Sequence, residues 1–316
     1  MTRGLAGGQL HHTMSENKKP AAVKPGKAAA LARLRKTIDA VDTKIHDLIL
    51  KRADTVAAIA AAKGMGAGPD TGAVENAMRP GREAQILRRL AARHTGKLPL
   101  SVIFRVWREI ISAKLALQAP FSLAVYSGDD APDYWDLARA HFGSSAPMTP
   151  FAKANQVVQE CAASTSVIGI VPAPGAEAPA ARAWWTQLGR GEGVKPLVIA
   201  RLPFIEGTSP SAFVIASAMP EESGDDLSLV AVEVEPDVSR GRLVGLLKAH
   251  GLEGAIIDGV NEDKRKSPAL FLVQVPGFVP PGDPRLAQFA KAAREAVSFV
   301  ALIGAYARPL AAKGST

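Results

Sequence analysis

The sequence predicts a multidomain protein in which an all-α N-terminal domain is followed by an α/β segment and an α+β domain. Three observations lead to this fold class. Residues 29–63 contain no Gly or Pro and repeat apolar side chains every three or four positions. After residue 118 the apolar residues form short runs typical of strands. From about residue 225 the pattern follows the order βαββαβ, which is typical of a ferredoxin-like fold.

The first helix is expected to run from about Ala29 to Lys63, after a disordered tail at residues 1–28 that is rich in Lys, Pro, Ala and Gly. Its length would be about 50 Å, more than a compact domain of some 90 residues can cover. We therefore expect an intertwined homodimer. The apolar seam of this helix consists of Leu31, Leu34, Ile38, Val41, Ile45 and Leu48.

Two cations interrupt this seam. Its next position is Arg52, and Lys63 follows eleven residues later on the same helix face. Because Lys and Arg are almost never fully buried without a partner, they either extend to solvent at the edge of the seam or meet a negative ligand.

A Gly- and Pro-containing loop at 64–81 leads to a second helix from about Gly81 to His94. Ser101 is expected to cap a third helix. Its predicted core stripe consists of Ile103, Trp107, Ile110, Lys114 and Gln118. Polar side chains thus end this stripe as well.

The α/β segment is expected to span residues 120–220, with an α+β domain at 225–312. Strands of the first are predicted at 121–128, 166–175, 196–204 and 211–220, with helices at 133–143 and 153–164. Strands of the second are predicted at 227–235, 254–260, 269–277 and 299–307, with helices at 239–251 and 285–297.

Composition and charge narrow the function classes. Of 316 residues, 47% are hydrophobic and 22% charged, as in soluble globular proteins. No apolar run is long enough for a bilayer and the first residues do not form a secretory signal, whether Met1 or Met14 is the start, so we expect a cytoplasmic protein. A single cysteine, Cys161, excludes an internal disulfide framework.

The positive charge is concentrated in the first third. Residues 1–118 carry 21 Lys and Arg against 9 Asp and Glu, while the rest carries 17 against 21. This asymmetry favours an anionic partner. No basic run interleaved with aromatics, zinc-finger spacing or RNA-binding signature is found, so we do not expect nucleic acid.

The segments LARLRKTIDAVDTKIHDLILKR, AAK, RPGREAQILRRL and IFRVWREIISAKLALQ resemble the all-helical chorismate mutases over residues 29–118. The resemblance implies a three-helix chain that dimerises through its long first helix, with active sites shared between chains. It implies chorismate as substrate, with no cofactor and no metal. It also implies that Arg35, Arg52 and Arg82 bind the two substrate carboxylates, Arg35 serving the partner's site.

By the same resemblance, Lys63 and Gln118 hydrogen-bond the ether oxygen and Glu83 accepts the substrate hydroxyl. Rearrangement of chorismate to prephenate requires no nucleophile, only a compact conformer and stabilisation of negative charge on that oxygen. Two positions depart from the family pattern. Arg79 replaces an acidic residue near the hydroxyl, and Lys114, where a small polar residue is usual, is either a carboxylate contact or a surface charge.

The domain order resembles the fused chorismate mutase–prephenate dehydratases, with FSLAVYSGDD and SVIGIVPAPG similar to strands of a periplasmic-binding-like lobe. The Thr-Arg-Phe motif of that family would fall on Ser211, Ala212 and Phe213, without its arginine. A second lobe would have only about 35 residues. We therefore expect a truncated lobe without dehydratase activity.

The last segment resembles an ACT regulatory domain through SRGRLVGLL, containing Gly241, Arg242 and Leu243, and through FVALIGAYAR. A second ligand motif is absent from IDGVNED, so an aromatic amino-acid effector and a dimerisation scaffold both remain open. The function expected is chorismate mutase in phenylalanine and tyrosine biosynthesis. The alternatives are a bifunctional mutase/dehydratase and a non-catalytic amino-acid sensor.

Overall fold

The computed structural model describes residues 25–62, 74, 77–128, 133–174, 183–190, 195–207, 210–260 and 267–311. The chain divides into two compact units, Met1–Ile59 and Ala60–Thr316. The described part of the first unit belongs to the helix α1, which spans Pro25–Ala62 and so ends just past the boundary of that unit. Among the described helices, none is both long and apolar enough to cross a membrane.

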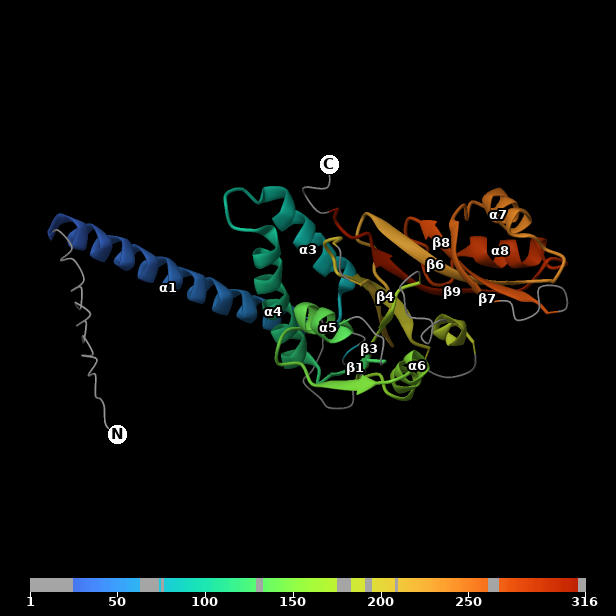
Figure 1. Cartoon of the computed structure of the whole chain (residues 1–316), viewed down its shortest axis with the longest axis horizontal. Coiled ribbons are helices and arrows are strands. Elements are labelled where there is room, and N and C mark those ends of the chain that lie inside the picture. The colour runs from blue at the N-terminus through green and yellow to red at the C-terminus, as the bar shows by residue number, and fades with distance from the viewer. Residues whose placement is uncertain are drawn as a thin grey trace, which may run out of the picture. The chain divides into compact units, whose positions relative to one another are not determined.

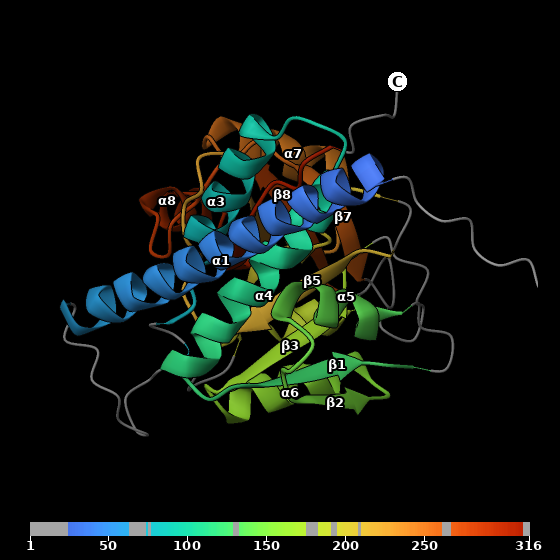
Figure 2. The ribbon, with the colours of Figure 1, turned by 90° about the vertical axis from the view of Figure 1, so that its left-hand side faces the viewer.

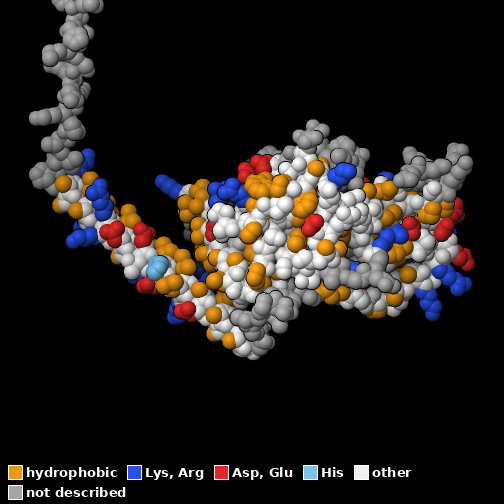
Figure 3. Space-filling model, turned by 90° about the horizontal axis from the view of Figure 1, so that it is seen from below, with side chains coloured by type: hydrophobic (Ala, Val, Ile, Leu, Met, Phe, Trp, Pro, Cys, Tyr) orange, Lys and Arg blue, Asp and Glu red, His pale blue; other side chains and the backbone are white. Residues whose placement is uncertain are grey.

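The helix α1 is continuous, as predicted (Figure 2). It begins at Pro25, a residue suited to a first helical position, so the predicted tail is wrong for residues 25–28. Residues 1–24 and Lys63 lie outside the described residues. The six seam side chains are 48–66% exposed in the single chain, and Figure 3 shows apolar side chains at the surface of α1. An apolar stripe of this length is typical of a helix that packs against another chain.

The second unit contains one sheet, whose nine described strands follow the order β2-β1-β3-β5-β4-β9-β6-β8-β7 (Figure 1). The strands are β1 (Ser122–Tyr126), β2 (Met148–Phe151), β3 (Val167–Pro172), β4 (Leu197–Leu202), β5 (Ala212–Ala216), β6 (Asp226–Val234), β7 (Ala255–Val260), β8 (Ala269–Pro276) and β9 (Val297–Ala307). The strands β2, β1 and β3 are parallel. The pairs from β9 to β7 are antiparallel.

Eight of these strands were predicted, and β2 was not. Its sequence, MTPF, contains a proline and is half-buried or exposed throughout. Proline is confined to edge strands because it donates no ladder hydrogen bond, and β2 lies at the edge of the sheet. A strand of this kind leaves no apolar run in the sequence.

Helices cover both faces of the sheet. They are α5 (Tyr134–Phe142), α6 (Ala154–Ala163), the short 3₁₀-helix η2 (Trp184–Gln187), α7 (Arg240–Ala249) and α8 (Pro284–Ala292). The helices α5 and α6 follow β1 and β2, on opposite faces of the parallel strands (Figure 1). The helices α7 and α8 share a core with β6 and β8, into which they bury Leu243, Leu247 and Phe289. The predicted βαββαβ order is confirmed by these elements.

The segments predicted as separate domains at 120–220 and 225–312 share this sheet. The strands β4 and β9 are parallel neighbours that meet at Val198 and Gly304. A continuous apolar core includes residues of both segments, among them Val214 and Leu229. The loop between residues 220 and 225 therefore does not separate two sheets.

Two helices of the predicted mutase domain, α3 (Pro80–Arg93) and α4 (Leu100–Gln118), belong to the second unit. Leu87 of α3 and Phe104 of α4 form a cluster with Phe204, which follows β4. Arg88 of α3 donates hydrogen bonds to Ser223 Oγ at 2.8 Å and to three backbone carbonyls, those of residues 223, 225 and 308. These contacts fix α3 against the segment before β6 and the end of β9.

Replacing Gly304 with Ala is expected to destabilise the second unit by about 1–3 kcal/mol. A Cβ at this position would lie 2.2 Å from the Val198 carbonyl oxygen, and the φ of 148° is unfavourable for other residues. Urea unfolding measures the change. The matched control is Gly245→Ala in α7, where a Cβ meets nothing within 4 Å and helix propensity predicts a gain of about 0.5–1 kcal/mol. Equal stability of the two variants would contradict the close approach of β4 and β9 at Gly304.

Candidate active site

The first turn of α3 is held tightly against the segment before β6. Pro80 occupies a first-turn position, where its missing N–H costs no hydrogen bond. A Cβ on Gly81 would lie 2.7 Å from the Glu222 carbonyl oxygen, so the two backbones are in contact. Arg79 donates from Nε to Oε1 of Glu221. Contacts with the segment before β6 therefore fix the turn that carries three predicted site residues.

The buried face of α4 differs from the predicted stripe. The deeply buried residues are Phe104, Arg108, Ile111, Ser112 and Leu115. The predicted stripe from Ile103 to Gln118 is half-buried and lies one position away, which is about 100° around the helix.

The reason for this difference is the contact of α4 with α5 and with the segment that follows β4. Phe104 packs on Phe204 with ring centroids 6.2 Å apart, and Ser112 Oγ donates to the Phe142 carbonyl at the end of α5. The expected cap is also wrong, since Pro99 occupies the N-cap position and Ser101 already lies within the helix.

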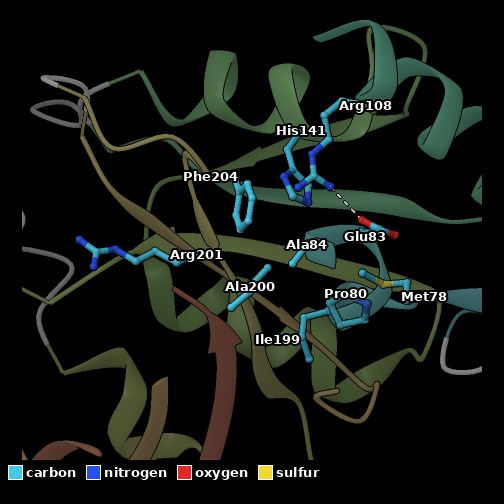
Figure 4. Close-up of a pocket in the computed structure, with 11 residues that line it drawn as sticks. Met78, Pro80, Glu83, Ala84, Arg108, His141, Ile199, Ala200, Arg201 and Phe204 are labelled. Carbon is cyan, nitrogen blue, oxygen red and sulfur yellow. Dashed lines mark hydrogen bonds and ion pairs between the residues drawn. The ribbon is translucent and has the colours of Figure 1, made fainter. Parts of the chain in front are cut away.

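A buried ion pair joins α3 and α4. Arg108 Nη1 donates to Glu83 Oε2 at 2.8 Å, and the side chains are only 8% and 18% exposed (Figure 4). Burial raises the pKa of the Glu83 carboxyl, while the positive charges of Arg108 and Lys114 act in the opposite direction. Removing one partner of such a pair costs about 3–5 kcal/mol, because the other charge stays buried.

The pair lies at the wall of a cavity of about 20 Å³ between α3, α4, α5 and β4. Its lining includes Met78, Glu83, Arg108, His141, Ile199 and Phe204, and Figure 4 shows the Arg201 guanidinium directed away from the pair. This volume is close to that of one water molecule, whereas ligand pockets measure roughly 300–1,000 Å³. The cavity is therefore too small for an organic substrate.

His141 completes the polar lining of this cavity. Burial lowers the pKa of its imidazole well below the usual value, and the positive charge of Arg108 acts in the same direction. The side chain is therefore neutral at physiological pH.

The two predicted site residues of α1 lie far apart in one chain. Arg35 is exposed and Arg52 is half-buried. The 17 positions between them correspond to roughly 26 Å along the helix axis, which is more than one small substrate spans.

The other predicted residues lie at two helix ends. Arg82 is exposed, and its Nη1 lies 3.3 Å from Gln85 Oε1. Lys114 and Gln118 are half-buried in the last turns of α4. Of the predicted residues, Glu83 and Lys114 interact electrostatically. Within the described part of the chain, no group of three or more His, Cys, Asp or Glu side chains is arranged as metal ligands.

Sequence reasoning missed Arg108. The signal was an arginine within a second apolar stripe, Phe104, Arg108, Ile111 and Leu115, at spacings of three and four. It is the same signal that marked Arg52 and Lys63.

Comparison with known proteins finds a family that the helical segment is similar to. Residues 34–119 match the family model described as chorismate mutase type II. The bifunctional chorismate mutase/prephenate dehydratase of Pseudomonas aeruginosa is 34% identical over 142 residues, which is 45% of this chain and 38% of that protein. The enzyme of the same name from Stutzerimonas stutzeri is 35% identical over 147 residues, or 46% and 39%. The chain thus spans about two fifths of the length of these relatives.

Among solved structures, a prephenate dehydratase from Arthrobacter aurescens in complex with L-Phe is similar at 14% identity and a TM-score of 0.45. The similarity covers 59% of this chain and 90% of that one.

The stability of the protein is expected to fall as the pH drops below about 6.5, the ordinary pKa of histidine. The folded-state pKa of His141 is lowered, so its stabilising contribution is present above the unfolded-state pKa and is lost as the pH falls toward the folded-state value. The slope from this residue reaches about 1.4 kcal/mol per pH unit. Urea unfolding between pH 7.5 and 5 measures it.

The variant His141→Gln should show a shallower slope than the wild type. The variant His46→Gln, at an exposed position of α1, serves as the control and should keep the wild-type slope. Identical slopes for His141→Gln and the wild type would show that His141 is not the group that titrates.

Proposed function

We propose that the chorismate mutase type II domain of this chain, residues 34–119, converts chorismate to prephenate in phenylalanine and tyrosine biosynthesis. The family match is the observation that carries this proposal, because it spans every residue predicted to bind the substrate, from Arg35 to Gln118. Curated relatives named as bifunctional chorismate mutase/prephenate dehydratases are also 34–37% identical to this chain over 112–147 residues.

The reaction is an intramolecular rearrangement, so the protein acts by binding and electrostatics. Arg35, Arg52 and Arg82 are the residues that we assign to the two carboxylates of chorismate. Guanidinium groups bind carboxylates in bidentate fashion, which selects the compact conformer in which the reacting carbons are close.

Negative charge grows on the ether oxygen as its bond to carbon breaks. Lys63 and Gln118 are the hydrogen-bond donors that we assign to this oxygen. Glu83 is assigned to accept a hydrogen bond from the hydroxyl of the substrate. Fixed donors at a developing charge stabilise the transition state more than the ground state.

The active unit that we propose is a homodimer that shares α1, with Arg35 of one chain completing the site of the other. The exposed seam of α1 and the roughly 26 Å between Arg35 and Arg52 support this arrangement. Covering six large apolar side chains is a substantial driving force for association.

Wild-type protein is expected to form prephenate from chorismate, and Lys63→Ala is expected to lower kcat/KM by about 100- to 1,000-fold, as loss of an oxyanion donor does. Loss of chorismate absorbance measures the rate. Lys51→Ala, an exposed lysine of α1, is the control and should retain full activity. Near-normal turnover by Lys63→Ala would exclude the assigned role.

The products of the same assay separate the alternatives. We expect prephenate without phenylpyruvate, because Ala212 occupies the place of the dehydratase arginine and is buried in β5. Phenylpyruvate would support the bifunctional alternative. Unchanged chorismate would support an amino-acid sensor, for which the βαββαβ segment is the proposed binding part.

Introducing Asp at both Leu34 and Ile45 is expected to produce a monomer with little mutase activity, because the charges lie in the proposed interface and the site needs two chains. Sedimentation velocity and the chorismate assay measure both effects. Thr43→Asp lies on the opposite face of α1 and should leave a dimer. An active monomeric double variant would contradict the shared site.

A further inference from the structure

We propose that Arg108 is a positioning residue for the mutase reaction: its guanidinium fixes the Glu83 carboxylate that accepts the substrate hydroxyl. This inference rests on the proposed function and extends its site to a residue that the resemblance does not include. It follows from the geometry of the buried pair between α3 and α4.

The geometry restrains one carboxylate oxygen. Arg108 Nη1 lies 2.8 Å from Glu83 Oε2, and Oε1 is the oxygen that we assign to the substrate hydroxyl. Arg108 is itself held within the buried face of α4, between Phe104 and Ile111. The carboxylate of Glu83 is therefore bound, through Oε2, to a side chain that is itself held in place.

A small cavity and tight backbone contacts restrain the pair further. The cavity beside it has room for about one water molecule, so Glu83 cannot turn far into it. Gly81 packs on the backbone at Glu222, which limits movement of the first turn of α3. Positioning of this quality matters, since a displacement of about 1 Å at a site can lower a rate 100-fold.

Titratable groups of α4, α5 and the segment before β6 act on the pair, whereas Arg201 of β4 is directed away from it. Arg108 and Lys114 approach from α4 and favour the ionised form of Glu83, whereas Glu221, before β6, opposes it. His141 approaches Arg108 from α5 and is neutral. Arg79 is paired with Glu221. Burial alone would favour the protonated form of Glu83. Arg108 is the group in direct contact with the carboxylate that favours its ionised form.

The test is the pH dependence of kcat/KM for chorismate in wild type, Arg108→Met and Arg108→Lys. In Arg108→Met we expect kcat/KM to fall about 10- to 100-fold at pH 7.5. The pKa of Glu83 rises when its cationic partner is removed, so the acid limb of the profile should move to higher pH. Arg108→Lys keeps the charge, and its acid limb should stay near that of wild type.

Two controls separate this role from a structural one. Arg105→Met removes an exposed arginine of the same helix and should leave the profile unchanged. Carbon-13 NMR titration of the Glu83 carboxyl, assigned with Glu83→Gln, reports its pKa without activity.

An active Arg108→Met variant with an unmoved acid limb and an unmoved carboxyl titration would overturn the proposal. If Arg108→Met does not fold, the Arg108→Lys variant decides. A wild-type value of kcat/KM in this variant would overturn positioning by the guanidinium. A lower kcat/KM at all pH values, with the acid limb unmoved, would support it. A wild type that forms no prephenate overturns the proposed function itself, and with it the assignment of Arg108 to that reaction.

Discussion

The close approach of two backbones, at Val198 in β4 and Gly304 in β9, determines the architecture of the second unit. Parallel pairing at this point joins an α/β half to a βαββαβ half in one sheet. Only a residue without Cβ permits the contact. Because β9 also ends beside the carbonyl groups that bind Arg88, the position of α3 depends on the same junction.

The elements that the sequence predicted well are those with strong local signals. The long helix predicted from a stretch without Gly or Pro is present but begins four residues earlier, and the apolar strands of the C-terminal half appeared at the expected residues. The β4–β9 pair could not be predicted in this way, since it joins residues about a hundred positions apart and depends on a single glycine in an apolar run. The edge strand β2 was missed because its side chains are not apolar enough to mark it.

The candidate site was predictable to the extent that its charges interrupt apolar patterns. Arg52 and Lys63 were predicted as site residues for this reason. Arg108 shows the limit of the method: two stripes of α4, one beginning at Ile103 and one at Phe104, are equally apolar in sequence. Which of them is buried depends on the contacts of α4 with α5 and with the segment after β4, and those contacts are tertiary.

The contacts that anchor α3 limit where this chain can be cut into parts that fold separately. The match to the chorismate mutase type II model ends at residue 119, yet the partner of Arg79 and the acceptors of Arg88 lie beyond residue 220. A gene fragment that stops after α4 would leave those guanidinium groups without their anchors and expose the apolar face of α3 and α4. The end of the family match is therefore not a boundary of folding, and the segment that it covers and the sheet that anchors α3 are expected to change together in evolution.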